Sequence, residues 1–230
     1  SILVPELLKR DYNVTVFDNF LYKQSSLNHL CTYKNLELVK GDIRVKETIK
    51  EQINKADIII PLAALVGAPL CNSDPVGAKS VNHDSILMML DLASKNQMIF
   101  MPTTNSAYGT GNEDNYCDEK SPLNPISQYA VEKVKIEEKL MDRELSISFR
   151  LATVFGMSPR MRLDLLVNDF TYRAIYDKFI ILFESHFKRN YIHVRDVANV
   201  FLHAIDNNQK MCGEIYNVGL SDANLSEKEL

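Results

Sequence analysis

The feature that most limits the fold of this chain is an alternation of short apolar runs with longer amphipathic segments. Apolar or β-branched runs that end in small or polar residues occupy 13–18, 36–43, 56–64 and 97–104, and a further strand pattern covers 145–156. Helical patterns occupy 2–9, 45–54, 77–94 and 127–142. Strands separated by helices predict βαβ units. We therefore expect an α/β fold with a Rossmann-type, doubly wound parallel sheet.

The pattern loosens after residue 156. Helical patterns cover 164–178 and 195–207, and strand patterns cover 189–194 and 213–219. We expect residues 1–156 to form the main domain, and residues 157–230 to form part of a small C-terminal substrate lobe that is interleaved with the main sheet. The last six residues, LSEKEL, predict the start of another helix with Ser226 as its N-cap.

Composition excludes several classes of function. The chain has 46% hydrophobic and 24% charged residues and a net charge of −4, without a long basic block, so nucleic acid is not an expected partner. Apolar runs fall short of the roughly 18 residues that a membrane span needs. The four Cys and five His are scattered, which favours reduced thiols and no metal site. We expect a cytoplasmic protein without a membrane partner.

Polar residues at the ends of the predicted strands are candidates for ligand binding, because ligands of such sheets sit at the carboxyl ends of the strands. Asp18 could accept both hydroxyls of an adenosine ribose and repel a 2′-phosphate, which favours NAD over NADP; an Asp that caps a turn is an equal alternative. Asp42 could face an adenine amino group, or could simply form a turn. Ala63 and Ala64 leave room for a flat ligand, although small residues there are also common packing.

Tyr129 and Lys133 lie four residues apart in the predicted helix 127–142, so they share one face. This spacing alone is weak, since it arises by chance about once in a chain of this kind. Thr104, however, ends the preceding strand, and the fold should bring its hydroxyl beside the start of this helix. A free Tyr has a pKa of about 10, and a nearby ammonium is expected to lower it toward the range of a useful base.

A series of short motifs gives the chain a wider resemblance. In order along the sequence they are NVTVFDN, GDI, PLAALVG, TTNSAYG, YAVEK, RLATVFG, RNYIHVRDVA and EIYNVG. Over nearly its whole length the chain resembles the extended short-chain dehydrogenase/reductases, and within them the NAD-dependent sugar-nucleotide epimerase/dehydratase family. The resemblance implies an NAD-binding Rossmann domain over residues 1–156.

The resemblance also implies roles for individual residues. The implied catalytic residues are Thr104, Tyr129 and Lys133. The implied cofactor-binding residues are Asp18, Asn19, Asp42, Ile43, Leu62, Ala63, Ala64, Asn82 and Thr103, together with Tyr129 and Lys133. The implied substrate-binding residues are Asn105, Ser106, Asn168 and Arg189. His193 is expected to be structural.

The sequence departs from the family pattern in two places. Family members open with a strand and a Gly-rich GxxGxxG turn that binds the pyrophosphate, whereas this sequence starts at Ser1, just after the position of the last Gly. We expect that the first strand, this loop and part of the C-terminal lobe are missing from the sequence, and that a chain without the loop binds NAD weakly. The second departure is Asn105-Ser106, which stands where the 4,6-dehydratases carry Asp-Glu, and this argues against dehydration.

The function that the resemblance implies is an NAD-dependent nucleotide-sugar epimerase. Hydride would pass from a nucleotide-diphospho-sugar to NAD⁺ and back, through a transient keto-sugar. The alternatives are a nucleotide-sugar reductase or dehydrogenase, a 4,6-dehydratase, or a non-catalytic NAD-binding module; the last would not need Thr104, Tyr129 and Lys133 together. The family likeness further implies a homodimer, packed through the helices at 80–94 and 127–142.

Overall fold

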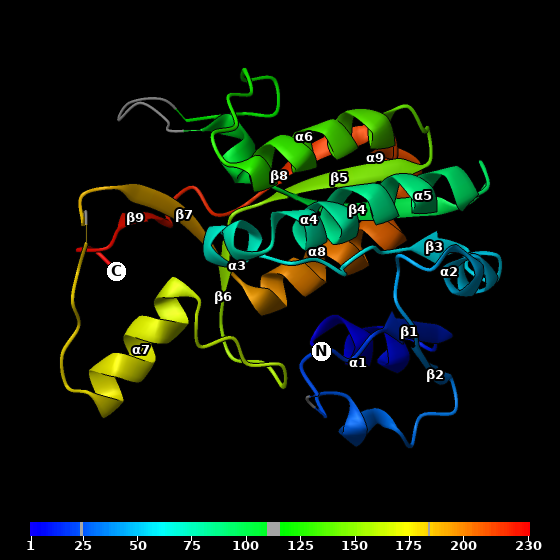
Figure 1. Cartoon of the computed structure of the whole chain (residues 1–230), viewed down its shortest axis with the longest axis horizontal. Helices are drawn as coiled ribbons and strands as arrows, with labels where there is room; N and C mark the ends of the chain where they lie inside the picture. The colour runs from blue at the N-terminus through cyan, green and yellow to red at the C-terminus, as the bar shows by residue number, and fades with distance from the viewer. Residues whose placement is uncertain (24, 110–115, 184) are drawn as a thin grey trace.

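The computed structural model describes residues 1–23, 25–109, 116–183 and 185–230. Its centre is a four-stranded sheet in the order β3-β4-β5-β8, and every neighbouring pair is parallel (Figure 1). The strands are β3 (Ile58–Ile59), β4 (Met98–Thr104), β5 (Ser146–Leu151) and β8 (Glu214–Val218).

Helices cover both faces of this sheet. One face packs against α2 (Lys46–Ile53), α5 (Ser85–Leu92) and α6 (Gln128–Met141), and the other packs against α1 (Leu3–Lys9) and α8 (Val194–Asp206). Successive side chains of a strand point to opposite faces. Accordingly Ile99 and Met101 of β4 join the core under α5 and α6, while Phe100 joins the core under α8. The predicted α/β fold with a parallel sheet is confirmed.

A separate parallel pair is formed by β1 (Val14–Asp18) and β2 (Leu36–Lys40), with Asp18 opposite Lys40. The Gly41 N–H donates to the carbonyl of Asp18 at 2.9 Å. The loops that follow these two strands therefore begin at the same edge.

A second group of strands lies on the other side of the molecule from β1 and β2 (Figure 1). It comprises β6 (Thr153–Phe155), β7 (Lys188–His193) and β9 (Asn224–Ser226), with β6–β7 parallel and β7–β9 antiparallel. Helix α7 (Leu166–Tyr176) connects to this group, whereas α8 and β8 return to the central sheet.

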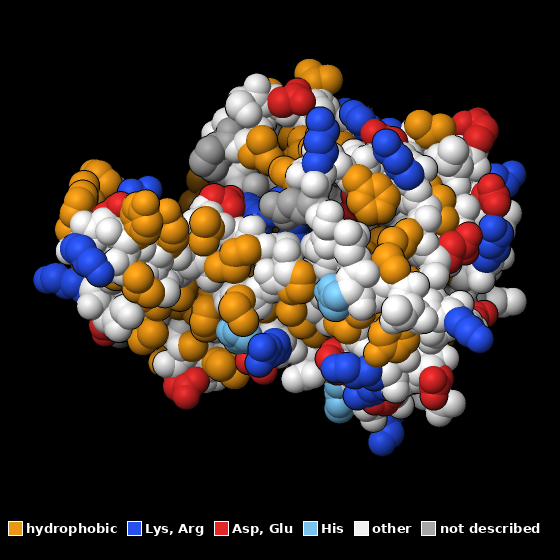
Figure 2. Space-filling model, turned by 90° about the horizontal axis from the view of Figure 1, so that it is seen from below, with side chains coloured by type: hydrophobic (Ala, Val, Ile, Leu, Met, Phe, Trp, Pro, Cys, Tyr) orange, Lys and Arg blue, Asp and Glu red, His pale blue; other side chains and the backbone are white. Residues whose placement is uncertain are grey.

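The stretch from α7 to β7 carries many large apolar side chains on its surface. Figure 2 shows hydrophobic side chains gathered over this part of the molecule. The exposed ones include Tyr172, Ile175, Tyr176, Phe179, Ile181, Phe183 and Phe187. The hydrophobic core that reaches into residues 157–230 is shared with β4 and β5, through Ile192, Val197 and Phe201.

Three predicted elements differ from the structure. The strand expected over 56–64 contains only β3, because Pro61 has no N–H for the ladder and the chain leaves the sheet there. The strand expected over 145–156 is two strands, because the chain changes partners after Ala152. The N–H of Ala152 still donates to Val218 O on β8 at 2.8 Å, whereas Thr153–Phe155 pair with β7. The helix expected over 77–94 is divided by a π-helical turn at Ser80–Asp84.

The helix expected from Ser226 is also wrong for the residues described. Ser226 ends β9 and a turn follows it. The N–H of Ser226 donates to Glu229 Oε2 at 2.9 Å, as in the glutamate half of a capping box, but its hydroxyl donates to the same oxygen at 2.8 Å and does not accept from the backbone as an N-cap would.

The remaining helical segments are short. They are the 3-10 turns η1 (Asn28–Leu30) and η3 (Asn105–Tyr108), the π-helical turn η2 (Ser80–Asp84), and the helices α3 (Ala68–Ser73), α4 (Pro75–Lys79) and α9 (Asn208–Met211).

None of the helices in the described ranges is long and apolar enough to cross a bilayer. Among the same residues, His, Cys, Asp and Glu form no cluster of three that could hold a metal ion.

Candidate active site

The carboxyl end of β4 places Thr104 at the start of the turn η3. Its Oγ1 accepts a hydrogen bond from the N–H of Ser106 at 3.1 Å, so the side chain caps the turn that carries Asn105 and Ser106. Gly109 ends this turn with φ +74°, and a Cβ there would collide with the carbonyl of Asn124. Only Gly suits this position, which folds the chain back beside the end of β4.

Helix α6 presents Tyr129 and Lys133 to the same region. Ser127 caps the helix through its Oγ, which accepts from the N–H of Ala130 at 3.2 Å, so Tyr129 lies in the first turn. Lys133 Nζ lies 5.9 Å from the centre of the Tyr129 ring and donates to the carbonyl of Pro102 on β4 at 3.4 Å. The structure thus brings Lys133 against the strand that ends at Thr104, and α6 also contacts η3.

The electrostatics of the pair differ from the expectation that Lys133 lowers the pKa of Tyr129. Burial raises the pKa of Tyr129 to about 12, and the nearby Cys71 adds to the shift. Burial also lowers the pKa of Lys133 to about 8. In the protein without a ligand, removal from water favours the neutral form of both groups, and it outweighs an ammonium that is not in contact with the phenol oxygen.

Asn82 lies in the π-helical turn η2 and is buried. Its side-chain amide forms two hydrogen bonds of 2.8 Å with the N–H and the carbonyl of Leu65. It therefore fixes the loop after β3, in which Leu62 and Ala63 are exposed and Ala64 is partly buried. The amide of Asn82, predicted to bind the cofactor, is thus engaged by the protein's own backbone, and a cofactor contact of this residue stays a prediction. Interruptions of this kind in a helix are frequent at functional sites.

The predicted adenosine side lies at the ends of β1 and β2. Asp18 is exposed, and its Oδ1 accepts from the N–H of Phe20 at 2.6 Å, as in an Asx turn. Asn19 closes the next turn through Leu21 N–H at 3.0 Å. Both interpretations of Asp18 therefore stay open, because its Oδ2 makes no hydrogen bond to the residues that the structure describes.

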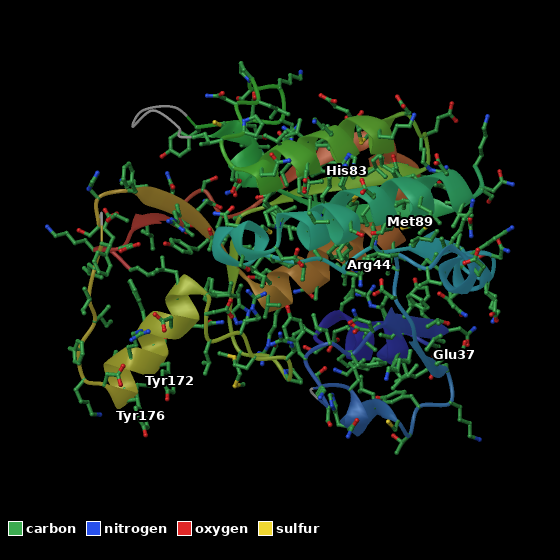
Figure 3. All side chains as sticks on the ribbon, viewed as in Figure 1. Glu37, Arg44, His83, Met89, Tyr172 and Tyr176 are labelled. Atoms are coloured by element: carbon green, nitrogen blue, oxygen red, sulfur yellow. The ribbon has the colours of Figure 1, made fainter. Side chains whose placement is uncertain are left out.

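Asp42 is engaged by its neighbour. Both of its carboxylate oxygens bind Arg44, one of them from Nε at 2.9 Å, and this hydrogen bonding lowers the pKa of Asp42 to about 2. Figure 3 shows Arg44 between the β1–β2 pair and the helices above it. Ile43, between the two, is partly buried. Contact of Asp42 with an adenine would have to compete with this ion pair.

The predicted substrate residues are divided between two regions: Asn105 and Ser106 lie in η3 at the end of β4, whereas Asn168 lies in α7 and Arg189 in β7. Asn168 is buried in α7, and both ends of its amide bind backbone: Oδ1 accepts from Gly156 N–H at 3.0 Å, and Nδ2 donates to Arg162 O at 2.9 Å. Arg189 is exposed on β7. His193 caps α8 by accepting from Arg195 N–H at 3.2 Å, which agrees with the structural role expected for it.

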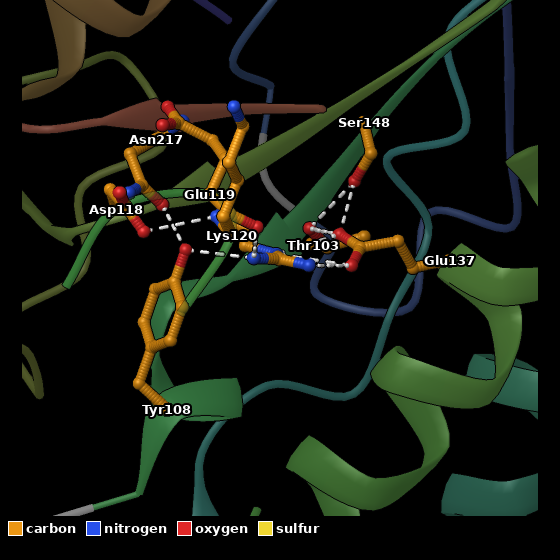
Figure 4. Close-up of polar contacts among 9 residues, drawn as sticks. Thr103, Tyr108, Asp118, Glu119, Lys120, Glu137, Ser148 and Asn217 are labelled. Carbon is orange, nitrogen blue, oxygen red and sulfur yellow. Dashed lines mark hydrogen bonds and ion pairs between the residues drawn. The ribbon is translucent and has the colours of Figure 1, made fainter. Parts of the chain in front are cut away.

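A buried polar network that the sequence analysis missed lies directly behind the site (Figure 4). Its centre is the ion pair of Glu137 on α6 with Arg150 on β5, whose side chains are only 5% and 4% exposed. The hydroxyls of Thr103 and Ser148 also donate to Glu137, at 3.0 and 2.6 Å. The hydroxyl of Thr103, predicted to bind cofactor, is thus used within the protein. The signals were an Arg inside an apolar strand and a Glu four residues after Lys133.

The residues present fit a dinucleotide cofactor. Lys133 is 5% exposed, and its ammonium has three N–H donors but makes one long hydrogen bond within the described parts of the chain. Buried donors normally find partners, so the remaining two suit the hydroxyls of a ribose. Asp18 offers a carboxylate oxygen at the end of β1, in the separate β1–β2 pair.

The chain is similar to known proteins over most of its length. The model of the NAD dependent epimerase/dehydratase family matches residues 1–219. A relative from Methanocaldococcus jannaschii, named "Putative UDP-glucose 4-epimerase", is 28% identical over 95% of this chain and 72% of its own length. A UDP-N-acetyl-alpha-D-glucosaminuronate decarboxylase from Bacillus cytotoxicus is 25% identical over 96% of this chain and 72% of its own.

Solved structures have the same fold. The UDP-glucose 4-epimerase of Thermus thermophilus, in complex with NAD, matches 99% of this chain and 76% of its own, with a TM-score of 0.83 and 23% identity. The dTDP-glucose 4,6-dehydratase of Bacillus anthracis, also in complex with NAD, matches 94% and 70%, with a TM-score of 0.80 and 21% identity. With the family match over residues 1–219, the chain belongs to the NAD-dependent epimerase/dehydratase family.

Proposed function

We propose that this protein is an NAD-dependent nucleotide-sugar epimerase. The observation that carries the proposal is the buried Lys133 ammonium, which uses one of its three donors among the residues that the structure describes and lies beside Tyr129 and the strand that ends at Thr104. A buried charge without full hydrogen bonding lowers stability, so its presence favours a functional role.

The proposed roles follow from the chemistry of these side chains. Bound NAD⁺ supplies reversible hydride transfer at a carbon of the sugar ring. Tyr129 removes the proton of the hydroxyl on that carbon, and Thr104 hydrogen-bonds the same oxygen. Lys133 would hold the ribose of the cofactor that lies next to its nicotinamide ring. Because the pKa of Tyr129 is about 12 without a ligand, Tyr129 becomes a base only when positive charge is added beside it.

The type of reaction is inferred from the residues after Thr104. Asn105 and Ser106 provide no carboxyl group to assist loss of water, which favours epimerisation over 4,6-dehydration. The decarboxylase relative adds a competing possibility that the sequence analysis did not weigh, since a family member of 25% identity carries that name. Decarboxylation would require a sugar with a carboxyl group.

The products separate these reactions. The purified protein is incubated with NAD and, in separate samples, UDP-glucose or UDP-glucuronate, and products are identified by chromatography and mass spectrometry. An epimerase gives a product of unchanged mass and leaves the cofactor oxidised. Loss of water would indicate a dehydratase, release of carbon dioxide a decarboxylase, and a net conversion of NAD a dehydrogenase or reductase. Each of these results would contradict the proposed epimerase.

The replacement Tyr129→Phe removes the hydroxyl of the proposed base. It is expected to lower kcat at least about 100-fold, the usual contribution of a general base, with folding unchanged. The control is Tyr33→Phe, which removes an exposed hydroxyl near β2 and should have no effect. Full activity in Tyr129→Phe would exclude the proposed mechanism.

The family likeness also supports a homodimer as part of the proposal. The helices that would meet are α5 and α6, which lie next to each other on one face of the sheet. Sedimentation equilibrium tests this, and a monomer at micromolar concentration would contradict it.

A further inference from the structure

The buried network behind the active site contains charges that the proposed mechanism does not use. Arg150 and Glu137 are 3% and 4% exposed, and both form hydrogen bonds with groups of other segments. Burying two charges costs free energy that their mutual attraction often only offsets, so stability alone is a weak reason for such a pair. The segments that Arg150 and Glu137 join are better evidence for the role of the pair.

One half of the network holds the catalytic helix to the sheet. Glu137 follows Lys133 by one helical turn on the same face of α6. Its carboxylate accepts from Arg150 Nε at 3.0 Å and from Thr103 Oγ1 at 3.0 Å. Thr103 lies directly opposite Arg150 in the parallel register of β4 and β5, and it precedes Thr104. The position of α6 is thereby fixed against the strand end that carries Thr104.

The other half holds the connection between β4 and α6. Arg150 Nη1 donates to the hydroxyl of Tyr108 at 2.8 Å and to the carbonyl of Glu119 at 3.2 Å. The Tyr108 hydroxyl donates to Asn217 Oδ1 on β8 at 2.6 Å, and Asn217 Nδ2 donates to the carbonyl of Cys117 at 3.1 Å. One guanidinium thus reaches residues on both sides of the segment 109–116 (Figure 4).

The planar guanidinium suits this task because it carries five N–H donors in a fixed geometry. Burial raises the pKa of the Tyr108 phenol, although Arg150 opposes the shift, so the hydroxyl keeps its proton and can donate to Asn217. Hydrogen bonds therefore run outward from Arg150, through the Tyr108 hydroxyl to Asn217 on β8 and directly to Glu137 on α6.

We propose that Arg150 is a positioning residue: through Glu137 and Tyr108 it fixes the face of α6 that carries Tyr129 and Lys133 relative to Thr104. The inference deepens the proposed function and rests on it for the identity of the reacting groups. Misplacement of a reacting group by about 1 Å can cost roughly 100-fold in rate, so the network has kinetic as well as structural consequences.

The test replaces the ion pair by apolar residues of similar volume, Glu137→Leu with Arg150→Met. Such replacements are often neutral for stability, and Thr103 and Ser148 can still bond each other, since their hydroxyls lie 2.9 Å apart. We expect a urea midpoint close to that of the wild type, with kcat for UDP-glucose lowered about 10- to 100-fold and KM changed less than about threefold. Unchanged kcat in the folded double variant would overturn the proposal.

Two further variants keep the test decisive if the double variant does not fold. Tyr108→Phe removes a single hydroxyl and is expected to lower kcat by a smaller factor, about three- to tenfold, without a change in KM. The matched control is the exposed pair of Glu51 on α2 and Lys55 just after it, replaced in Glu51→Leu with Lys55→Met, which should leave kcat unchanged. Equal kcat in Tyr108→Phe and the wild type would count against a positioning role.

A measurement without substrate separates this inference from the proposed function. The ¹³Cζ resonance of labelled Tyr129, assigned by its loss in Tyr129→Phe, should respond to ionisation of Lys133 near pH 8. If the wild type has no activity, the proposed function fails, but the positioning role still predicts that this inflection moves by at least about half a pH unit or disappears in the double variant. An identical titration in a folded double variant would overturn it.

Discussion

Two buried charges on one face of α6, one turn apart, have opposite surroundings. The carboxylate of Glu137 accepts from Arg150, Thr103 and Ser148, and its residue is 4% exposed. Lys133 is 5% exposed, but its ammonium makes a single hydrogen bond of 3.4 Å within the described residues. The sequence spacing of the two is the same as that of Tyr129 and Lys133, so spacing does not distinguish them.

The difference separates a structural charge from a charge that is kept for a ligand. A buried group whose bonds are satisfied within the protein fixes the elements that it joins. A buried group with unused donors costs stability until something binds it. The strength of this contrast can be tested by removing each charge in turn.

The largest effect on stability is expected from breaking the satisfied pair. Arg150→Met alone leaves Glu137 buried and without its cation, and we expect a loss of about 3–5 kcal/mol in the free energy of unfolding. Urea denaturation measures the loss as a lower midpoint. The exposed Lys55→Met is the control, with an expected change below about 0.5 kcal/mol. A loss below about 1 kcal/mol for Arg150→Met would contradict the contrast, because the Glu137 carboxylate would then gain no more stability from its partners than the Lys133 ammonium does.

Removing the unsatisfied charge of Lys133 is expected to raise the free energy of unfolding, whereas removing Arg150 is expected to lower it. The pKa of Lys133 falls from 10.5 to about 8 on folding, so below pH 8 the folded state carries the full cost of the buried ammonium, and above pH 10.5 it carries none. Lys133→Met keeps the length of the side chain and removes the charge. At pH 7 we expect it to raise the free energy of unfolding by about 2–4 kcal/mol.

The pH dependence provides the check on Lys133→Met. The gain over the wild type should shrink as the pH rises from 8 to 10.5, because the wild-type amine becomes neutral in the unfolded state as well. Urea midpoints at pH 7, 8.5 and 10 would follow this trend. A variant that is less stable than the wild type at pH 7 would mean that the ammonium is satisfied within the protein.

The smallest effect is expected at the exposed pair of Asp42 and Arg44, whose side chains are 26% and 45% exposed. We expect Arg44→Gln to change the free energy of unfolding by less than about 1 kcal/mol at pH 7, because water screens the pair. Folding lowers the pKa of Asp42 from 3.8 to about 2, so its contribution is complete above pH 3.8 and is lost as the pH falls toward 2. Arg44→Gln should remove most of this acid dependence, as midpoints at pH 2.5 and 5 would show.

The amino-acid sequence by itself determined the order of strands and helices and the position of most of them. Apolar runs that end in polar residues specify strands buried on both faces, and the prediction of a parallel α/β sheet needed nothing else. The motif GDI and the spacing of Tyr129 and Lys133 placed candidate residues at strand and helix ends. Two of the errors fell where the chain leaves the sheet near Pro61 or changes partner after Ala152, and the others were the π-helical turn at Ser80–Asp84 and the turn after Ser226.

Only the tertiary structure decided which polar side chains are used within the protein and which are left for a ligand. Thr103 and Thr104 are neighbours of the same type, yet the first bonds Glu137 inside the core and the second caps the turn at the strand end. The partner of Arg150 comes from a helix 13 positions earlier, and its other contacts come from segments brought together only by the sheet. Hydrogen-bond partners depend on distance in space and on exclusion of water, and sequence spacing specifies neither.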